Sequence, residues 1–376
     1  MKKTFAVASL VLALATGSAL AEDTLLKDAQ ATFQPIPDQA PVIKGNEATP
    51  DKIELGKMLY FEPRLSKSAL ISCNTCHNVG MGGADFQQTS TGHGWKQGPR
   101  NSPTVFNSVF NVAQFWDGRA KDLAEQAKGP IQAGVEMNST PENVVKTLNS
   151  MPEYVALFKK AFPTDKDPVS FDNMARAIEV FEATLITPGA RFDTFLKGEA
   201  TALNDVEKEG LKLFMANECA SCHGGVNMGG DDYYPLGVVS KPREEIIAGD
   251  KGRFAITAAK DDEFAFKSPS LRNIELTPPY FHSGVVWSLE ESIEVMNDSQ
   301  VGADLAEGDI AKIAAFLRTT TGKQPQVVHP ILPAPTATTP LPSLKYWRPR
   351  RFAVPPPVRI AGRAVFFRQS GPTRRR

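Results

Sequence analysis

The 376-residue chain is poor in the side chains that most often bind metals and cofactors, with only four cysteines and five histidines. Beyond its N-terminus it has no apolar run of about 20 residues, the length that a membrane-spanning helix needs. It also has no convincing stretch of alternating apolar and polar residues, which is the pattern of half-buried strands. These absences exclude an internal membrane span and a mainly β fold. We therefore expect a mainly α protein with long loops and little β structure.

The four cysteines form two pairs, and a histidine follows each pair. The first motif is Cys73-Asn74-Thr75-Cys76-His77, and the second is Cys219-Ala220-Ser221-Cys222-His223. Two thiols at this spacing lie on one side of a helical turn, where each can bond to one haem vinyl group. A lone C-x-x-C pair also occurs in redox dithiols and zinc sites, but C-x-x-C-H is the pattern of c-type haem attachment. We expect two covalent haems, with His77 and His223 as axial ligands.

The N-terminus has the pattern of a secretory signal peptide. Two lysines precede an apolar run at residues 5–15, and Ala19-Leu20-Ala21 follows as a cleavage site. The apolar run is shorter than a membrane anchor requires. We expect cleavage after residue 21 and export to an oxidising compartment. Four cysteines in such a compartment would ordinarily suggest disulfides, but the adjacent histidines indicate that haem consumes the thiols.

The formal net charge of zero conceals an uneven distribution. Residues 323–376 contain eleven Lys or Arg and no Asp or Glu. Without these eleven and the two lysines at positions 2 and 3, the chain has 29 basic residues against 42 acidic ones. This acidic body favours a partner with a basic face, because complementary fields accelerate encounter. A solvated acidic surface that only maintains solubility explains the charge equally well. We expect no nucleic-acid partner.

Capping residues before two similar apolar runs predict a repeated unit. Thr49 with Pro50 opens one helix, and Asn204 with Glu207 opens the other. The runs that follow are Gly56-Lys57-Met58-Leu59-Tyr60-Phe61 and Gly210-Leu211-Lys212-Leu213-Phe214. Each leads into a C-x-x-C-H motif, which indicates an internal duplication of a cytochrome c-like module.

The rest of the chain predicts two haem domains flanked by segments without a core of their own. Further helices are expected at 123–128, 141–148, 153–162, 171–185, 288–296 and 308–319, and a capping box of Ser288 and Glu291 opens the fifth of these. Residues 22–48 are expected to form an extended wrap, and residues 80–118 a long loop region. We predict domains at 22–188 and 189–325.

The last part of the chain, residues 326–376, is predicted to be a disordered tail. It is rich in Pro, Ala, Thr and Arg and lacks the periodicity that forms a core. It would be either a basic interaction arm or a read-through product.

Few residues are available as sixth ligands of the two irons. His93 lies between two glycines in the loop region, where it could bind an iron and also leave it, although a solvated loop histidine is the simpler interpretation. His282 is a second candidate. Methionine also ligates haem iron and raises its potential. Met296, 73 residues after His223, can cross over the second haem, although such a methionine is more often part of a core.

These features together resemble the bacterial di-haem cytochrome c peroxidases, a periplasmic family related to the MauG-type enzymes. The resemblance covers residues 48–321. It rests on the two haem motifs and on Gly92-His93-Gly94, Phe115-Trp116-Asp117-Gly118-Arg119, Gln126, Glu136-Met137, Pro279-Tyr280-Phe281-His282-Ser283-Gly284 and Met296.

The resemblance implies different tasks for the two haems. The first would be the low-potential peroxidatic centre, with His77 as proximal ligand and His93 as distal ligand of the resting state. The second would be the high-potential electron entry site, with His223 and Met296 as ligands. Trp116 would couple the haems electronically, a role compatible with its packing at a domain interface.

The resemblance also implies a catalytic pair and a calcium site. Glu136 and Gln126 match the distal-pocket residues, which would move the proton of bound peroxide and hold its oxygen. Outside this resemblance, Glu136 would be assigned to the surface. Asn101, Thr277 and Pro279 match calcium ligands that lie between the haem domains.

The expected activity is the reduction of hydrogen peroxide with electrons from a small periplasmic donor, a cytochrome c or a cupredoxin. The family also implies a homodimer. Three alternatives remain: a MauG-like enzyme that oxidises a partner protein, a di-haem electron carrier without catalysis, and a structural zinc protein. Met296 speaks against the first alternative, because the MauG branch has tyrosine at this position.

Overall fold

The helices begin where the sequence supplies a side chain to cap them. In the computed structural model, which describes residues 24–343, the Thr49 side chain accepts a hydrogen bond from the Lys52 N–H and opens α2 (Pro50–Tyr60). Asn204 and Glu207 form the reciprocal capping box predicted for α9 (Asp205–Ala216). Both predicted helix starts are therefore confirmed.

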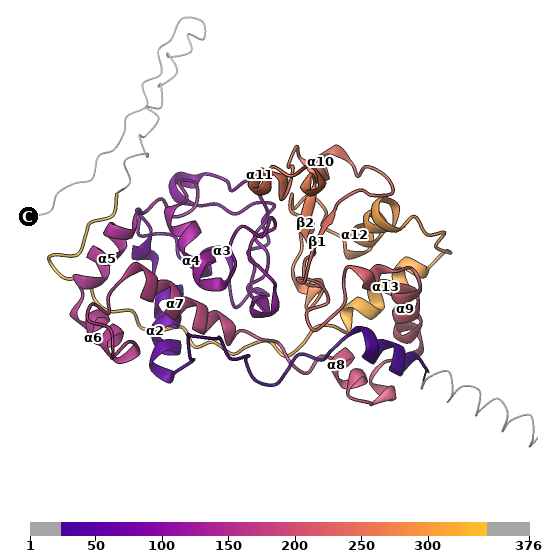
Figure 1. The fold of residues 1–376 in the computed structure, drawn as a ribbon, viewed down its shortest axis with the longest axis horizontal. Coiled ribbons are helices and arrows are strands. Elements are labelled where there is room, and N and C mark those ends of the chain that lie inside the picture. The colour runs from indigo at the N-terminus through magenta and orange to yellow at the C-terminus, as the bar shows by residue number, and fades with distance from the viewer. Residues whose placement is uncertain (1–23, 344–376) are drawn as a thin grey trace, which may run out of the picture. The chain divides into compact units, whose positions relative to one another are not determined.

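The described chain is mainly helical, which confirms the predicted fold class (Figure 1). Residues 24–32 are also helical, and the other labelled α-helices are α3 (Cys73–Cys76), α4 (Leu123–Gln132), α5 (Pro141–Asn149), α6 (Pro152–Ala161), α7 (Phe171–Ala183), α8 (Arg191–Leu196), α10 (Glu244–Ile247), α11 (Phe254–Thr257), α12 (Leu289–Met296) and α13 (Asp309–Arg318). The strands β1 (Tyr233–Pro235) and β2 (Ala265–Lys267) pair antiparallel, with Tyr234 opposite Phe266. No helix within residues 24–343 is long and apolar enough to cross a membrane.

The capping box predicted for α12 forms only in part. The Ser288 side chain accepts from the N–H of Glu291, as expected. The Glu291 carboxylate, however, accepts a hydrogen bond from Arg243. The ion pair between Arg243 and Glu291 thus takes the place of the hydrogen bond from the Ser288 N–H to the Glu291 carboxylate, which would have completed the capping box.

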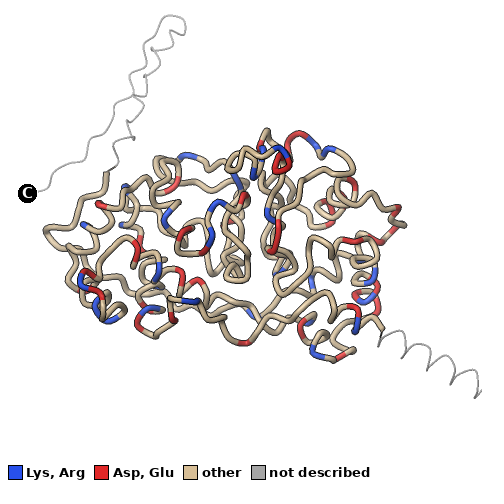
Figure 2. Tube along the Cα trace, in the orientation of Figure 1, with Lys and Arg blue, Asp and Glu red and all other residues tan. Residues whose placement is uncertain are grey.

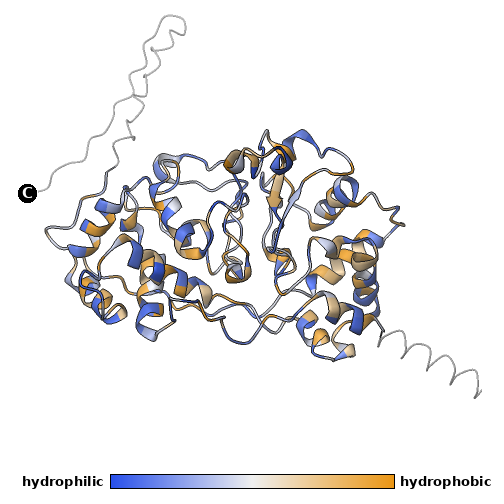
Figure 3. Ribbon diagram, in the orientation of Figure 1, coloured by the Kyte–Doolittle hydropathy of each residue, from blue (hydrophilic) through white to orange (hydrophobic). Residues whose placement is uncertain are grey.

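The apolar faces of the helices meet in two separate hydrophobic cores (Figure 3). The first core takes its buried side chains mainly from α2, α4, α5, α6 and α7. The second takes them mainly from α8, α9, α12 and α13. Acidic and basic residues occur in both parts of the chain, mostly on exposed turns and helix faces (Figure 2).

The two cores contain the same close helix crossing, at the glycines that the sequence comparison paired. A β-carbon on Gly56 of α2 would lie 1.9 Å from the Ala177 carbonyl oxygen of α7. A β-carbon on Gly210 of α9 would lie 2.0 Å from the Lys312 carbonyl oxygen of α13. Only glycine allows two helix backbones to approach so closely. The shared crossing supports the predicted duplication.

The N-terminal segment packs into the second core. Residues 24–32 are helical, and Leu25, Ala29 and Phe33 lie among the side chains of that core. The Phe33 ring meets the Phe192 ring edge-on at 5.3 Å. The expected extended wrap is therefore wrong for residues 24–32, because apolar side chains at helical spacing gain a partner face from α8 and α9.

The segment after α13 packs against the first core. Val327 and Leu332 contact its buried side chains, the His329 ring lies 4.7 Å from the Phe61 ring, and Thr336 donates to the Ser150 carbonyl. Disorder was expected from residue 326 on, and this expectation is wrong for residues 326–343. The segment has no core of its own but lies on one built by other helices. The predicted signal peptide and residues 344–376 lie outside the described residues.

Candidate haem centres

The first cysteine pair lies on one helical turn at the wall of a cavity. In α3, the Thr75 hydroxyl accepts from the Ser72 N–H at 2.9 Å and fixes the start of the turn. Cys73, Cys76 and His77 all line a cavity of about 580 Å³. None of the four cysteines forms a disulfide, so all four sulfur atoms are available for haem attachment.

The His77 ring is held in the tautomer that suits an iron ligand. Its Nδ1 lies 2.9 Å from the Pro103 carbonyl oxygen. Because a carbonyl can only accept, Nδ1 carries the proton and Nε2 keeps its lone pair for a metal. Burial lowers the pKa of His77, which favours the neutral ring. The Tyr60 hydroxyl donates to the His77 carbonyl and fixes the backbone beside the ring.

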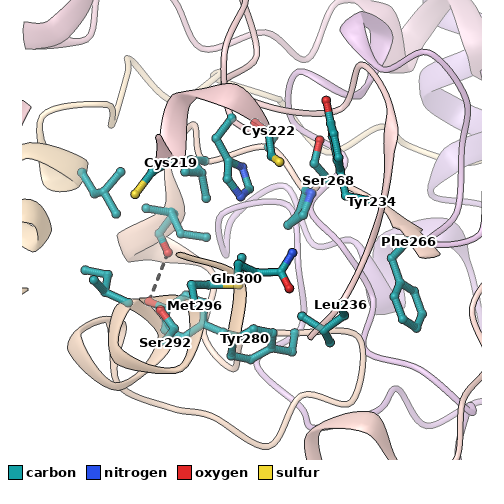
Figure 4. Close-up of a pocket in the computed structure, with 18 of the residues that line it drawn as sticks. Cys219, Cys222, Tyr234, Leu236, Phe266, Ser268, Tyr280, Ser292, Met296 and Gln300 are labelled. Carbon is teal, nitrogen blue, oxygen red and sulfur yellow. Dashed lines mark hydrogen bonds between the residues drawn. The ribbon is translucent and has the colours of Figure 1, made fainter. Parts of the chain in front are cut away.

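The second pair lies in a short 3₁₀ turn, Cys219–Ser221, at the wall of a cavity of about 610 Å³. Nδ1 of His223 lies 3.4 Å from the Met228 carbonyl oxygen, so this ring resembles His77 in its tautomer. Met296, the last residue of α12, lines the same cavity. Cys219 and Cys222 lie on one side of the cavity, and Met296 lies across from them (Figure 4). The second C-x-x-C-H motif and the Met296 thioether therefore face each other across this cavity.

Gln126 and Glu136 line the first cavity together with His77. Gln126 is on α4, whose N-terminus is capped by Asp122, and Glu136 lies in the turn that follows this helix. Burial raises the pKa of Glu136, and the charge of Arg119 partly opposes this shift. The cavity thus combines a carboxyl group poised to exchange a proton with an amide that can donate a hydrogen bond.

His93 is buried beside this cavity, but it is not one of the residues that line it. Its backbone N–H donates to the Glu136 carbonyl at 2.6 Å. Gly92 packs so tightly on the same turn that a β-carbon would lie 2.2 Å from the Val135 carbonyl oxygen. The loop of His93 and the turn of Glu136 are therefore fastened to each other through their backbones.

Trp116 and Asn101 line both cavities. The indole N–H of Trp116 donates to the Asn101 carbonyl at 2.9 Å, and the Asn101 N–H donates to the His282 carbonyl at 2.7 Å. The Trp116 ring is thus part of the wall between the cavities, and Asn101 links it to the backbone of His282.

His282 is not placed as an iron ligand, although the sequence left this role open. Its ring stacks on Phe266 at 4.1 Å and meets Trp116 edge-on at 6.2 Å. Its Nε2 lies 3.3 Å from the Ile247 carbonyl oxygen, which fixes a proton on that nitrogen. His282 therefore packs the wall between the cavities.

Asn101, Thr277 and Pro279 all line the second cavity. They offer an amide oxygen and backbone carbonyls, the hard ligands that calcium prefers. Within residues 24–343 no group of three His, Cys, Asp or Glu side chains could hold a metal ion. A cation between the cavities would therefore depend on neutral oxygens.

Sequence reasoning missed two buried ionisable residues that line the cavities. Glu182 of α7 lines the first cavity, and burial followed by the charge of Glu179 raises its pKa to about 8. Lys267 of β2 lines the second cavity. Neither residue belongs to a motif, and Glu182 lies in an amphipathic helix where a glutamate would ordinarily face water. No local pattern could have identified them.

Both cavities fit a haem c group, as judged by the donors that they present. Each has two thiols and one imidazole nitrogen on the same wall. The second also has a thioether opposite them. These are the attachment and axial groups that c-type haem requires.

Comparisons with known proteins agree with this arrangement. A family model described as di-haem cytochrome c peroxidase matches residues 50–201, and a cytochrome c model matches residues 207–321. The cytochrome c551 peroxidase of Pseudomonas aeruginosa is 56% identical over 336 residues, which cover 89% of this chain and 97% of that protein. The cytochrome c551 peroxidase of Nitrosomonas europaea is 47% identical over 340 residues, which cover 90% and 98%.

A solved structure shows the same similarity in three dimensions. The crystal structure of a MauG-like protein associated with microbial copper homeostasis has a TM-score of 0.68 and 28% sequence identity. The match covers 76% of this chain and 95% of that one. The chain therefore belongs to the di-haem cytochrome c peroxidase family, and is an oxidoreductase with two haem c groups.

Proposed function

We propose that this peroxidase reduces hydrogen peroxide to water in the periplasm, at the haem held by Cys73, Cys76 and His77. The observation that carries the proposal is the lining of the first cavity, where Gln126 and Glu136 accompany His77. The haem supplies an iron that binds peroxide and exchanges electrons with it. The side chains around it supply the proton transfer and the orientation.

Glu136 is the proton-transfer residue of this proposal. Cleavage of the O–O bond requires a proton on the departing oxygen. The Glu136 carboxylate would take a proton from one oxygen of peroxide and return it to the departing oxygen. Its raised pKa brings the carboxyl closer to working pH, where a group both accepts and releases protons efficiently. The Gln126 amide donates a hydrogen bond that holds the bound oxygen in place.

His223 and Met296 would hold the iron of the second haem, which would supply the site where electrons enter, and Trp116 would lie on the path to the first haem. The support for this path is that Trp116 lines both cavities. A methionine ligand raises haem potential, which suits an electron-receiving site. Two donor molecules, arriving one at a time, restore the enzyme after each peroxide.

His93 would hold the first iron in a resting state and would be released from it on activation. The hydrogen bond between the His93 N–H and the Glu136 carbonyl supports this proposal, because it couples the ligand loop to the catalytic turn. A shift of this loop would remove a ligand and place the proton-transfer residue in one movement.

Calcium, held by Asn101, Thr277 and Pro279, would stabilise the wall between the two haems. Asn101 lines both cavities and receives the Trp116 indole bond on its carbonyl. A cation on its side chain would therefore restrain the position of Trp116.

The donor is a small periplasmic protein, a cytochrome c or a cupredoxin, and the enzyme works as a homodimer after its signal peptide is removed. Two relatives are named cytochrome c551 peroxidases, which supports a cytochrome. The excess of acidic over basic residues outside positions 1–21 and 323–376 suits a donor with a basic face.

A MauG-like oxidation of a partner protein is the second candidate, since a MauG-like protein is among the similar structures. Met296 argues against it, because this sulfur lies opposite the second cysteine pair where the MauG branch has a tyrosine (Figure 4).

Steady-state turnover of the two-haem enzyme with reduced cytochrome c and hydrogen peroxide tests the proposal. Glu136→Gln should lower kcat by a factor on the order of 10²–10⁴, the usual contribution of a positioned acid–base group. Glu153→Gln, a change at an exposed glutamate of α6, is the matched control and should leave kcat unchanged. A wild-type enzyme that accepts electrons from the donor but ignores peroxide would establish an electron carrier instead.

A further inference from the structure

The second cavity contains a buried positive charge that no part of the described chain neutralises. Lys267 at the end of β2 is only 7% exposed and lines this cavity. Its backbone N–H donates to the Trp116 carbonyl at 2.8 Å. Its ammonium group has no hydrogen-bond or ion-pair partner within residues 24–343. Burial lowers the pKa of Lys267 to about 8, with no opposing contribution from a nearby carboxylate.

An unpaired buried ammonium is costly, because it loses its hydration and gains no counter-charge in return. Lysine is almost never fully buried in proteins unless it is paired. Another buried cation of this half of the chain shows the usual solution, since Arg272 binds Asp193 at 2.7 Å. Lys267 therefore lies where an anion from outside the chain would complete its environment.

The lining of the cavity restricts what this anion can be. Lys267 is the one Lys or Arg among the described lining residues, and the one Asp or Glu there, Glu218, is exposed. The residues on either side of Lys267, Phe266 and Ser268, lie along the cavity wall near Tyr234 (Figure 4). A haem has two carboxylate side chains, and in a largely apolar cavity at least one of them requires a cationic partner.

We propose that Lys267 is the anchor for a propionate of the second haem, and that its charge raises the reduction potential of that haem. A positive charge beside the haem disfavours the ferric state, which carries one more positive charge than the ferrous state. The backbone N–H of Lys267 also donates to the Trp116 carbonyl. Lys267 would therefore connect the second haem to Trp116, which lines both cavities. The inference rests on the proposed placement of the second haem between Cys219, Cys222 and Met296.

The test is a potentiometric titration of the purified two-haem enzyme at pH 7, with the two haems followed separately by their visible bands. Lys267→Met should lower the midpoint potential of the methionine-ligated haem and leave that of the first haem close to wild type. Lys267→Arg keeps the charge and should restore most of the wild-type potential. Lys260→Met removes the same charge from an exposed site and is the matched control, with no shift expected.

Resonance Raman spectra provide a second readout, because the propionate bending band of the second haem should shift in Lys267→Met and not in Lys260→Met. Loss of the second haem from Lys267→Met but not from Lys267→Arg would also support the anchor. An unchanged potential in Lys267→Met, or an equal effect of the methionine and arginine variants, would overturn it.

The outcome is separable from that of the proposed function. Peroxide turnover of the wild-type enzyme tests the function, whereas the potential of the second haem tests Lys267. Suppose that the wild type does not reduce peroxide but that Lys267→Met lowers the potential of the second haem. This result would refute the proposed function and support the role of Lys267 as propionate anchor.

Discussion

The carboxyl group of Glu136 has a pKa that depends on two opposing influences. Burial raises the pKa above the usual carboxyl value of 4.5, and the charge of Arg119 lowers it. If Glu136 must be ionised to accept a proton, activity is lost as the pH falls through this raised pKa. The acid limb of the kcat/KM profile should therefore lie above the range of an ordinary glutamate.

Removal of the Arg119 charge should move the acid limb of the kcat/KM profile further toward high pH. Without its opposing field, the pKa of Glu136 rises, so Arg119→Met should shift the acid limb of kcat/KM to higher pH. Arg119→Lys keeps the charge and should stay close to wild type. A limb that moves to lower pH, or does not move, would show that Glu136 is not the group that titrates.

His93 is the residue whose proposed role depends most on a change of state. In the wild type, activity should require prior reduction of the second haem, because a ligand must leave the first iron. His93→Gly should be active without prior reduction. Trp95→Ala, a change in the same loop at a side chain that is 72% exposed, is the control and should keep the requirement. If His93→Gly and the wild type depend equally on prior reduction, His93 is not the ligand that leaves the first iron.

Single residues were predictable where one short motif carries the chemistry. The C-x-x-C-H spacing identified His77 and His223, and both rings have the tautomer of an iron ligand. Glu136 and Gln126 came only from the family resemblance. Lys267 was not predictable, because its burial results from contacts between segments far apart in the chain.

At the scale of secondary-structure elements, the two glycine crossings are the most specific packing feature. Gly56→Ala would place a methyl group on the α7 backbone, and Gly210→Ala would place one on the α13 backbone. Because a main-chain carbonyl cannot rotate away, each change should lower the free energy of unfolding by about 3 kcal/mol. Urea unfolding of the holoenzyme measures it.

Gly134→Ala serves as the control for both changes. This glycine is exposed, and the nearest atom to an added β-carbon is 3.9 Å away. Its effect should stay within about 0.5 kcal/mol. Losses below about 1 kcal/mol in both core variants would mean that the helices can separate at little cost.

Elements were predictable where local chemistry defines them. The Thr49 and Asn204 caps start α2 and α9 as expected, because capping involves residues three positions apart. The helix at residues 24–32 was missed, since its stability comes from the second core rather than from a cap. The boundary predicted at residue 188 remains a prediction.

At the scale of the whole molecule, each end of the described chain packs on the core that lies farther away in sequence. Residues 24–33 join the second core, and residues 327–332 lie on the first. The sequence could not predict this exchange, because composition reports whether a segment can form its own core and not whether it covers another. Residues 24–33 should therefore stabilise the second core, and residues 327–332 the first.

Neighbouring side chains in the second segment provide a matched test. Leu332 contacts the first core, whereas Ile331 is 95% exposed. Leu332→Ala should lower the free energy of unfolding by about 1–2 kcal/mol, as expected for a partly buried leucine. Ile331→Ala should change it by less than about 0.5 kcal/mol. Equal effects of the two variants would show that the segment does not stay on the core in solution.

The central claim is that one haem receives peroxide while the other keeps its methionine and supplies electrons. The most direct measurement records visible and EPR spectra of the ascorbate-reduced enzyme with calcium, before and after one equivalent of hydrogen peroxide. The account predicts a high-spin signal from one haem, which peroxide consumes at once, and a second haem whose spectrum changes in Met296→Ala. Two haems that stay low-spin and do not respond to peroxide would contradict it.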